Sequence, residues 1–202
     1  MEETILHNYA MLRGVLREAP RFSHQNREER FYRFSLDVAR LSCAVDTVHI
    51  IAREALLAAL EPGGGDKLCV CGELRSFNNR SGVGAKLVIT VFARELWLDS
   101  GEDENVIELR GTLCKAPNYR VTPMGREICD LMLAVRRRYG RCDYLPCIAW
   151  GASAREAADW NVGDAVRLTG RIQSRVYQKL IDGAPVEKTA YEVSVIQIGP
   201  DE

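Results

Sequence analysis

Arginine and aromatic residues lie close together in two stretches of the second half of the chain. The first stretch contains Arg136, Arg137, Arg138, Tyr139 and Arg141. In the second stretch, basic residues lie on both sides of Tyr177 in the sequence: Arg171, Arg175 and Lys179. Cationic side chains bind phosphates, and flat aromatic rings stack on nucleobases. These two stretches therefore predict a surface that binds a strand of nucleic acid.

Residue types that catalyse reactions or bind metals are not arranged for either task. The three histidines, His7, His24 and His49, all lie in the first half, and none belongs to an acid–base or triad motif. The glycine run at residues 63–65 is not part of a phosphate-binding loop motif. The seven cysteines are an odd number and lack the paired spacing of a zinc site. We therefore expect no enzymatic activity, no cofactor, no bound metal and no disulfide framework.

The composition is that of an ordinary globular protein. Of the 202 residues, 47% are hydrophobic and 27% are charged, and the net charge is −1. No apolar run reaches the roughly 18 residues that a membrane span needs, and the N-terminus lacks the pattern of a signal peptide. We therefore expect a soluble cytoplasmic protein without a membrane partner. The charge is uneven, because residues 105–200 carry 14 basic and 10 acidic side chains.

The chain contains one pattern twice. When the sequence is shifted by 97 residues, positions 8–55 align with positions 105–152, with 14 identities in 48 columns. Residues 99–104 are acidic, contain no apolar side chain and separate the two copies. We therefore predict two homologous units, residues 1–100 and residues 101–202.

Each unit shows the period-two alternation of strands with one buried face, as at Leu131, Leu133 and Val135. Helix formers interrupt this alternation at residues 152–160. Three strands, a short helix and two more strands predict a five-stranded Greek-key barrel, the OB-fold. The fold class is then all-β, with two tandem barrels and one short helix in each. A seven-stranded immunoglobulin-like sandwich is the competing prediction, but it has no place for the helix and needs more strands.

Glycine occupies an equivalent position inside the first strand of each unit. Gly14 and Gly111 align in the repeat, and each follows a Leu-Arg pair. A glycine inside a strand often marks a tight bend. We expect the first strand to bend at this position, because it serves both halves of the barrel.

The second unit resembles the bacterial single-stranded DNA-binding protein family over residues 104–198. Its matching motifs are Asn105-x-Ile-x-Leu-x-Gly111, Thr122-Pro-Met-Gly125, Asp143-Tyr144-x-Pro-Cys-x-Ala149-Trp150-Gly151 and Gly163-Asp-x-Val-x-Leu-x-Gly170. The chain is also similar to primosomal replication protein N, which has the same fold. This resemblance implies sequence-tolerant binding of single-stranded DNA in replication, recombination or repair, with RNA left open. It also implies a homodimer whose two chains supply four barrels.

The resemblance also implies where bases stack. The family's aromatic positions correspond here to Tyr139, Tyr144, Trp150 and Tyr177. The same columns of the first unit hold Ser42, Thr47, Arg53 and Asn79, none of which has an aromatic ring. We therefore expect the second unit to be the principal DNA-binding unit and the first to be degenerate. Arg120, in the hairpin between the first two strands of the second unit, is a further candidate for a phosphate contact.

The chain departs from the resembled family at its C-terminus. It stops at Glu202, directly after the last predicted strand, without the family's flexible linker and acidic tip. We therefore expect no recruitment of partner proteins by such a tail. This departure keeps an alternative function open, namely an accessory factor of replication restart or of a mobile element that acts mainly through protein contacts.

Overall fold

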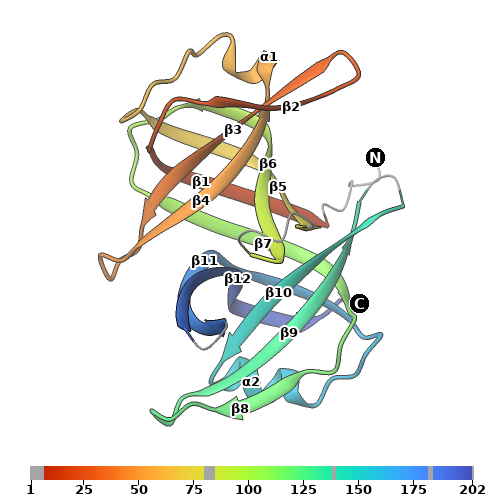
Figure 1. The fold of residues 1–202 in the computed structure, drawn as a ribbon. Helices are drawn as coiled ribbons and strands as arrows, with labels where there is room; N and C mark the ends of the chain where they lie inside the picture. The colour runs from red at the N-terminus through yellow and green to blue at the C-terminus, as the bar shows by residue number, and fades with distance from the viewer. Residues whose placement is uncertain (1–6, 80–84, 138–139, 182–183, 202) are drawn as a thin grey trace. The chain divides into compact units, whose positions relative to one another are not determined.

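The computed structural model describes residues 7–79, 85–137, 140–181 and 184–201 (Figure 1). The chain divides into two compact units. Residues 9–75 and 89–106 form one unit. The other contains residues 107–202 and 76–88, together with the residues before Tyr9. No helix in the described ranges is long and apolar enough to cross a membrane.

The first barrel is a closed ring of five strands. Its elements are β1 (Asn8–Leu16), β2 (Arg21–Asn26), β3 (Glu29–Ala39), β4 (Val45–Arg53), α1 (Glu54–Leu57), β5 (Lys67–Asn78) and β6 (Leu87–Leu98). β1 pairs with β5 and, near its end, with β3. β3 pairs with β4, β4 pairs in parallel with β6, and β6 neighbours β5. These pairings close the ring β1–β3–β4–β6–β5.

The second barrel repeats this arrangement. Its elements are β7 (Glu104–Leu113), β8 (Asn118–Val121), β9 (Glu127–Arg136), β10 (Cys142–Trp150), α2 (Ala152–Ala158), β11 (Ala165–Ile181) and β12 (Ala184–Pro200). β7 pairs with β9 and β11, β9 pairs with β10, and β10 pairs in parallel with β12, which pairs with β11. The prediction of two tandem five-stranded OB-fold barrels is therefore confirmed.

Each barrel carries one strand that the sequence pattern does not predict. β2 and β8 add to the outside of β3 and β9 as the first half of a hairpin. Nearly all of their residues are exposed. Burial therefore selects no hydrophobic alternation in these strands: β2 shows none, and the alternation of Tyr119 and Val121 in β8 spans only four residues.

The two aligned glycines allow the first strand of each barrel to approach its neighbour closely. A Cβ atom on Gly14 would lie 2.5 Å from the carbonyl oxygen of Asp37, and one on Gly111 would lie 2.6 Å from that of Ala134. No side chain fits at either distance. The missing side chain lets β1 and β7 each pair with strands on both of their edges.

The barrel interior is filled by every second residue of each strand. In β10, Leu145, Cys147 and Ala149 point inward and are buried, whereas Tyr144 and Trp150 are exposed. The same alternation along β4 buries Val48, Ile50 and Ala52. On β10, the outward residues Tyr144 and Trp150 are therefore accessible to a ligand, whereas the outward residue Ile148 is covered.

Candidate nucleic-acid interface

Two predicted stacking residues lie on the same outward face of β10. Tyr144 is 52% exposed and Trp150 is 37% exposed. They are six residues apart, so their Cα atoms are separated by roughly 20 Å along the extended strand. Both belong to the even-numbered residues of β10, which alternate with the buried odd-numbered ones. The strand thus presents two separate rings on one side of the barrel.

Trp150 is held at its polar edge. Its indole Nε1 donates a hydrogen bond to the hydroxyl oxygen of Ser194 on β12, at 3.2 Å. Ser194 is buried, and its backbone pairs with that of Ile148. This bond satisfies the indole N–H and fixes the ring orientation, while part of the ring stays in solvent. A base could therefore stack on a ring that is already positioned.

Tyr177 lies on β11 beside a predicted cation. Tyr177 is 36% exposed, and the guanidinium carbon of Arg175 lies 5.8 Å from its ring centroid. Arg175 also lies near Glu192, with 3.8 Å between Nε and the carboxylate. The distance between Arg175 and Tyr177 is that of a cation–π contact. Here the structure places a predicted ring and a predicted cation together.

The structure describes some of the other predicted basic residues but not all of them. Arg136, at the end of β9, and Arg141 are exposed. Arg171 is half-buried, and its Nε has no hydrogen-bond partner among the described residues. Arg138 and Tyr139 lie outside the described residues, as does the side chain of Lys179. Their predicted contacts with nucleic acid stay predictions.

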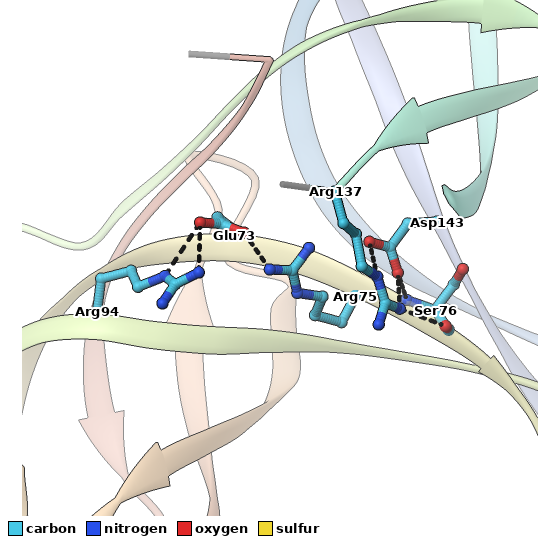
Figure 2. Close-up of polar contacts among 6 residues, drawn as sticks. All are labelled: Glu73, Arg75, Ser76, Arg94, Arg137 and Asp143. Carbon is cyan, nitrogen blue, oxygen red and sulfur yellow. Dashed lines mark hydrogen bonds and ion pairs between the residues drawn. The ribbon is translucent and has the colours of Figure 1, made fainter. Parts of the chain in front are cut away.

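Arg137 is engaged with a buried carboxylate. Its guanidinium donates two hydrogen bonds to Asp143, one of them 2.7 Å long, and a further one to the carbonyl oxygen of Ser76 at 3.2 Å. Asp143 is fully buried and also accepts the backbone N–H of Ser76 at 2.6 Å (Figure 2). The hydroxyl of Ser76 in turn accepts the backbone N–H of Tyr144 at 2.7 Å. Arg137 thus positions the backbone beside Tyr144, whereas its predicted phosphate contact is untested.

Arg120 of β8 is paired with an acidic neighbour. It donates hydrogen bonds to both carboxylate oxygens of Asp130 on β9, at 2.8 and 3.3 Å. These bonds raise the pKa of the Arg120 guanidinium above its usual value. The carboxylate also offsets its charge, which weakens the case for a phosphate contact at this residue.

Comparison with known proteins gives one consistent result. The model of the single-strand binding protein family matches residues 104–200. Single-stranded DNA-binding protein B of Bacillus subtilis (strain 168) is 33% identical over 81 residues, which cover 37% of this chain and 72% of that protein. The chain belongs to the single-strand binding protein family.

Other relatives extend the comparison. Single-stranded DNA-binding protein 2 of Listeria innocua is 33% identical over 81 residues, and the match covers 51% of its length. The chain thus spans about half the length of this curated relative. The wild-type single-stranded DNA-binding protein of Thermus aquaticus has a TM-score of 0.78 at 20% identity, covering 96% of this chain and 93% of that one. At this identity, the match shows a shared fold.

The match to the single-strand binding protein family spans the whole second barrel, from β7 to β12. Tyr144, Trp150 and Tyr177 all lie within it. The sequence prediction missed two residues that position these rings, Ser194 and Asp143. Asp143 carried a signal, because Arg137 and Asp143 recur in the repeat as Arg40 and Asp46. Ser194 carried none, since a serine in a strand is common.

Three of the seven cysteines are packed in the barrel interiors. Cys69, Cys129 and Cys147 are buried. Burial raises the pKa of the Cys69 thiol to about 11 and also raises the pKa of the Cys147 thiol. Such thiols stay protonated near neutral pH and are poor nucleophiles. Within the described residues, no group of histidine, cysteine and acidic side chains is placed to hold a metal ion.

Proposed function

We propose that the chain binds single-stranded DNA with little sequence preference, mainly through its second barrel, in replication, recombination or repair. The observation that carries this proposal is the pair of exposed rings, Tyr144 and Trp150, on one face of β10. Relatives named as single-stranded DNA-binding proteins support the choice of ligand. The proposal includes no catalytic step.

In this proposal, bases stack on the rings and arginines bind the intervening phosphates. Each stacked base contributes about 1–3 kcal/mol. Trp150 stacks without a large loss of rotational freedom, because Ser194 already fixes its edge. Arg136, Arg141 and Arg175 supply positive charge nearby in the sequence. Tyr139, Arg138 and Lys179 are retained on the strength of the sequence pattern.

The chain is proposed to act as two units, residues 1–100 and 101–202, and to associate as a homodimer with four barrels. Both proposals derive from the repeat and from the family resemblance. In the structure, residues 76–88 group with the second barrel. The outer part of the β5–β6 hairpin is therefore proposed to work with the second unit.

A fluorescence titration with oligo(dT) tests the proposed function. We expect tryptophan quenching and an affinity that falls as salt rises, because bound phosphates release counterions. Trp150→Ala should weaken binding by about 1–3 kcal/mol. The matched control is Trp160→Phe, at a half-buried position after α2. Anisotropy of a labelled oligonucleotide gives a readout that does not depend on the removed indole.

Two outcomes would contradict this proposal. If the unsubstituted chain does not bind oligo(dT) near physiological salt, the DNA-binding function is wrong and the protein-contact alternative gains support. If it binds but Trp150→Ala equals Trp160→Phe, the assignment of the site to the face of β10 is wrong.

A further inference from the structure

The strand register identifies which residues of the two barrels occupy equivalent positions. β10 and β12 run in parallel, with Ile148 opposite Ser194. In the first barrel, β4 and β6 run in parallel, with Ile51 opposite Phe92. Ile51 and Ile148 are aligned in the repeat. Phe92 is therefore the structural equivalent of Ser194.

A second observation gives the same equivalence. Gly72 lies opposite Ala10 of β1, and Gly170 lies opposite Ile107 of β7, the repeat equivalent of Ala10. A Cβ atom on Gly72 would lie 2.2 Å from the carbonyl oxygen of Phe92. One on Gly170 would lie 2.4 Å from the carbonyl oxygen of Ser194. Each glycine makes its close approach to the corresponding residue of the last strand.

Each barrel therefore has an aromatic ring where its parallel strands pair. In the second barrel the ring is on β10, and in the first it is on β6. In the second barrel, the ring is Trp150 of β10, in contact with Ser194 of β12. In the first barrel, the repeat equivalent of Trp150 is Arg53, whose guanidinium carbon lies 5.3 Å from the ring centroid of Phe92. On β4 the equivalent position is an arginine, and the ring lies on the neighbouring strand β6.

Two further arginines surround the same ring. The guanidinium carbons of Arg94 and Arg75 lie 5.0 and 6.0 Å from the centroid of Phe92. Glu73 accepts hydrogen bonds from both, including one from Arg94 Nε at 3.0 Å (Figure 2). Arg53 pairs with Glu29 at 2.6 Å. In these contacts, Arg53 pairs with Glu29, and Arg75 and Arg94 share Glu73.

These contacts leave the cluster able to bind a ligand. A guanidinium has five N–H donors, more than one carboxylate engages. The side chains of Arg53 and Arg94 are partly exposed, whereas that of Arg75 is more buried. Bases stack on guanidinium planes as well as on aromatic rings. The same groups also bind phosphates.

We propose that Phe92, Arg53 and Arg94 form a second subsite for single-stranded DNA on the first barrel. One base stacks over the arginine–phenylalanine layer, and Arg53 and Arg94 bind the phosphates on either side of it. This proposal rests on the proposed function of the second barrel and extends the bound strand to the first. It also replaces the expectation that the first barrel lacks a stacking position.

The test compares a short with a long oligonucleotide on the full chain. One OB barrel covers about 4–16 nucleotides, so oligo(dT) of about 10 nucleotides should occupy the second barrel alone, and one of about 40 nucleotides should reach both. The variants are Phe92→Leu and the double variant Arg53→Gln/Arg94→Gln. The matched control is Arg17→Gln, an exposed arginine of the same barrel that pairs with Asp37 and Thr47.

We expect both variants to bind the short oligonucleotide as the unsubstituted chain does. For the long one, Phe92→Leu should lose at least about fivefold in affinity, because one stacking position is lost. The double variant should lower the slope of log affinity against log salt by about 1.4, because each phosphate contact to a single strand contributes about 0.7. Arg17→Gln should change neither quantity.

The outcomes separate this inference from the proposed function. If both variants match Arg17→Gln on the long oligonucleotide while Trp150→Ala weakens it, the subsite is wrong and the proposed function stands. If the unsubstituted chain binds neither oligonucleotide, both are wrong. Thermal unfolding, monitored by circular dichroism, checks that each variant is folded. If Phe92→Leu is unstable, the double variant still tests the subsite, because Arg53 and Arg94 are partly exposed side chains.

Discussion

Tyr144 and Trp150 are positioned by different parts of their residues. Trp150 is fixed through its side chain by Ser194 at 3.2 Å. Tyr144 is fixed through its backbone, whose N–H donates to the Ser76 hydroxyl at 2.7 Å. Stacking does not require a side-chain hydrogen bond, since an exposed ring offers its face to a base whatever its hydroxyl contacts. The ring, rather than the phenol oxygen, should therefore determine what Tyr144 contributes.

Tyr144 should contribute to binding through its ring alone. Tyr144→Ala should weaken oligo(dT) binding by about 1–3 kcal/mol, whereas Tyr144→Phe should stay close to the unsubstituted chain, because it keeps the ring. Anisotropy titration measures both. Tyr119→Ala is the matched control, since Tyr119 of β8 is a similarly exposed tyrosine whose hydroxyl donates to Glu127. Equal losses in Tyr144→Ala and Tyr119→Ala would remove Tyr144 from the site.

At the scale of elements, the same ion pair joins the second and third barrel strands in both units. Arg137, after β9, binds Asp143 of β10, and Arg40, after β3, binds Asp46 of β4 with two bonds of 2.6 Å. Both carboxylates are fully buried. A buried carboxylate that loses its cationic partner is strongly destabilising. These pairs therefore hold the start of β4 and of β10 in place.

Removal of Arg137 should destabilise the protein far more than removal of its exposed neighbour. We expect Arg137→Ala to lower the free energy of unfolding by about 3–5 kcal/mol, because Asp143 is left buried without its partner. Arg136→Ala should stay within about 0.5 kcal/mol, as is usual for an exposed surface residue. Urea unfolding measures both. Similar small losses in the two variants would show that Asp143 is satisfied by its other contacts.

The sequence predicted the elements with buried faces and failed where burial gives no pattern. Period-two alternation predicted the barrel strands, whereas Tyr144 and Trp150 were assigned through the family resemblance. β2 and β8 were not predicted, because almost all of their residues are exposed. Phe92 was not predicted as a site residue for another reason. Its equivalence to Ser194 depends on strand register rather than on an ungapped alignment. Local sequence patterns do not show which distant strands pair or in which register.

At the scale of the whole molecule, tandem barrels favour binding to long strands. When one barrel has bound, the next meets the same strand at a high effective concentration. If each barrel has a binding site, the affinity for a long oligonucleotide should exceed that for a short one. The difference should be larger than the additional contacts alone would give. Association of two chains would multiply this effect, because four barrels would then share one strand.

The homodimer gives the last prediction. Sedimentation velocity should show a species of twice the chain mass of 22.7 kDa at micromolar concentration. The ratio of affinities for a long and a short oligo(dT) should then fall when the protein is diluted until the dimer dissociates. The reason is that linking binding sites in one assembly can raise the affinity for a long strand by about 10²–10⁴. A single species of one chain mass at every concentration would contradict the dimer. In that case, any preference for long strands would come from the two barrels of one chain, and the ratio would not change on dilution.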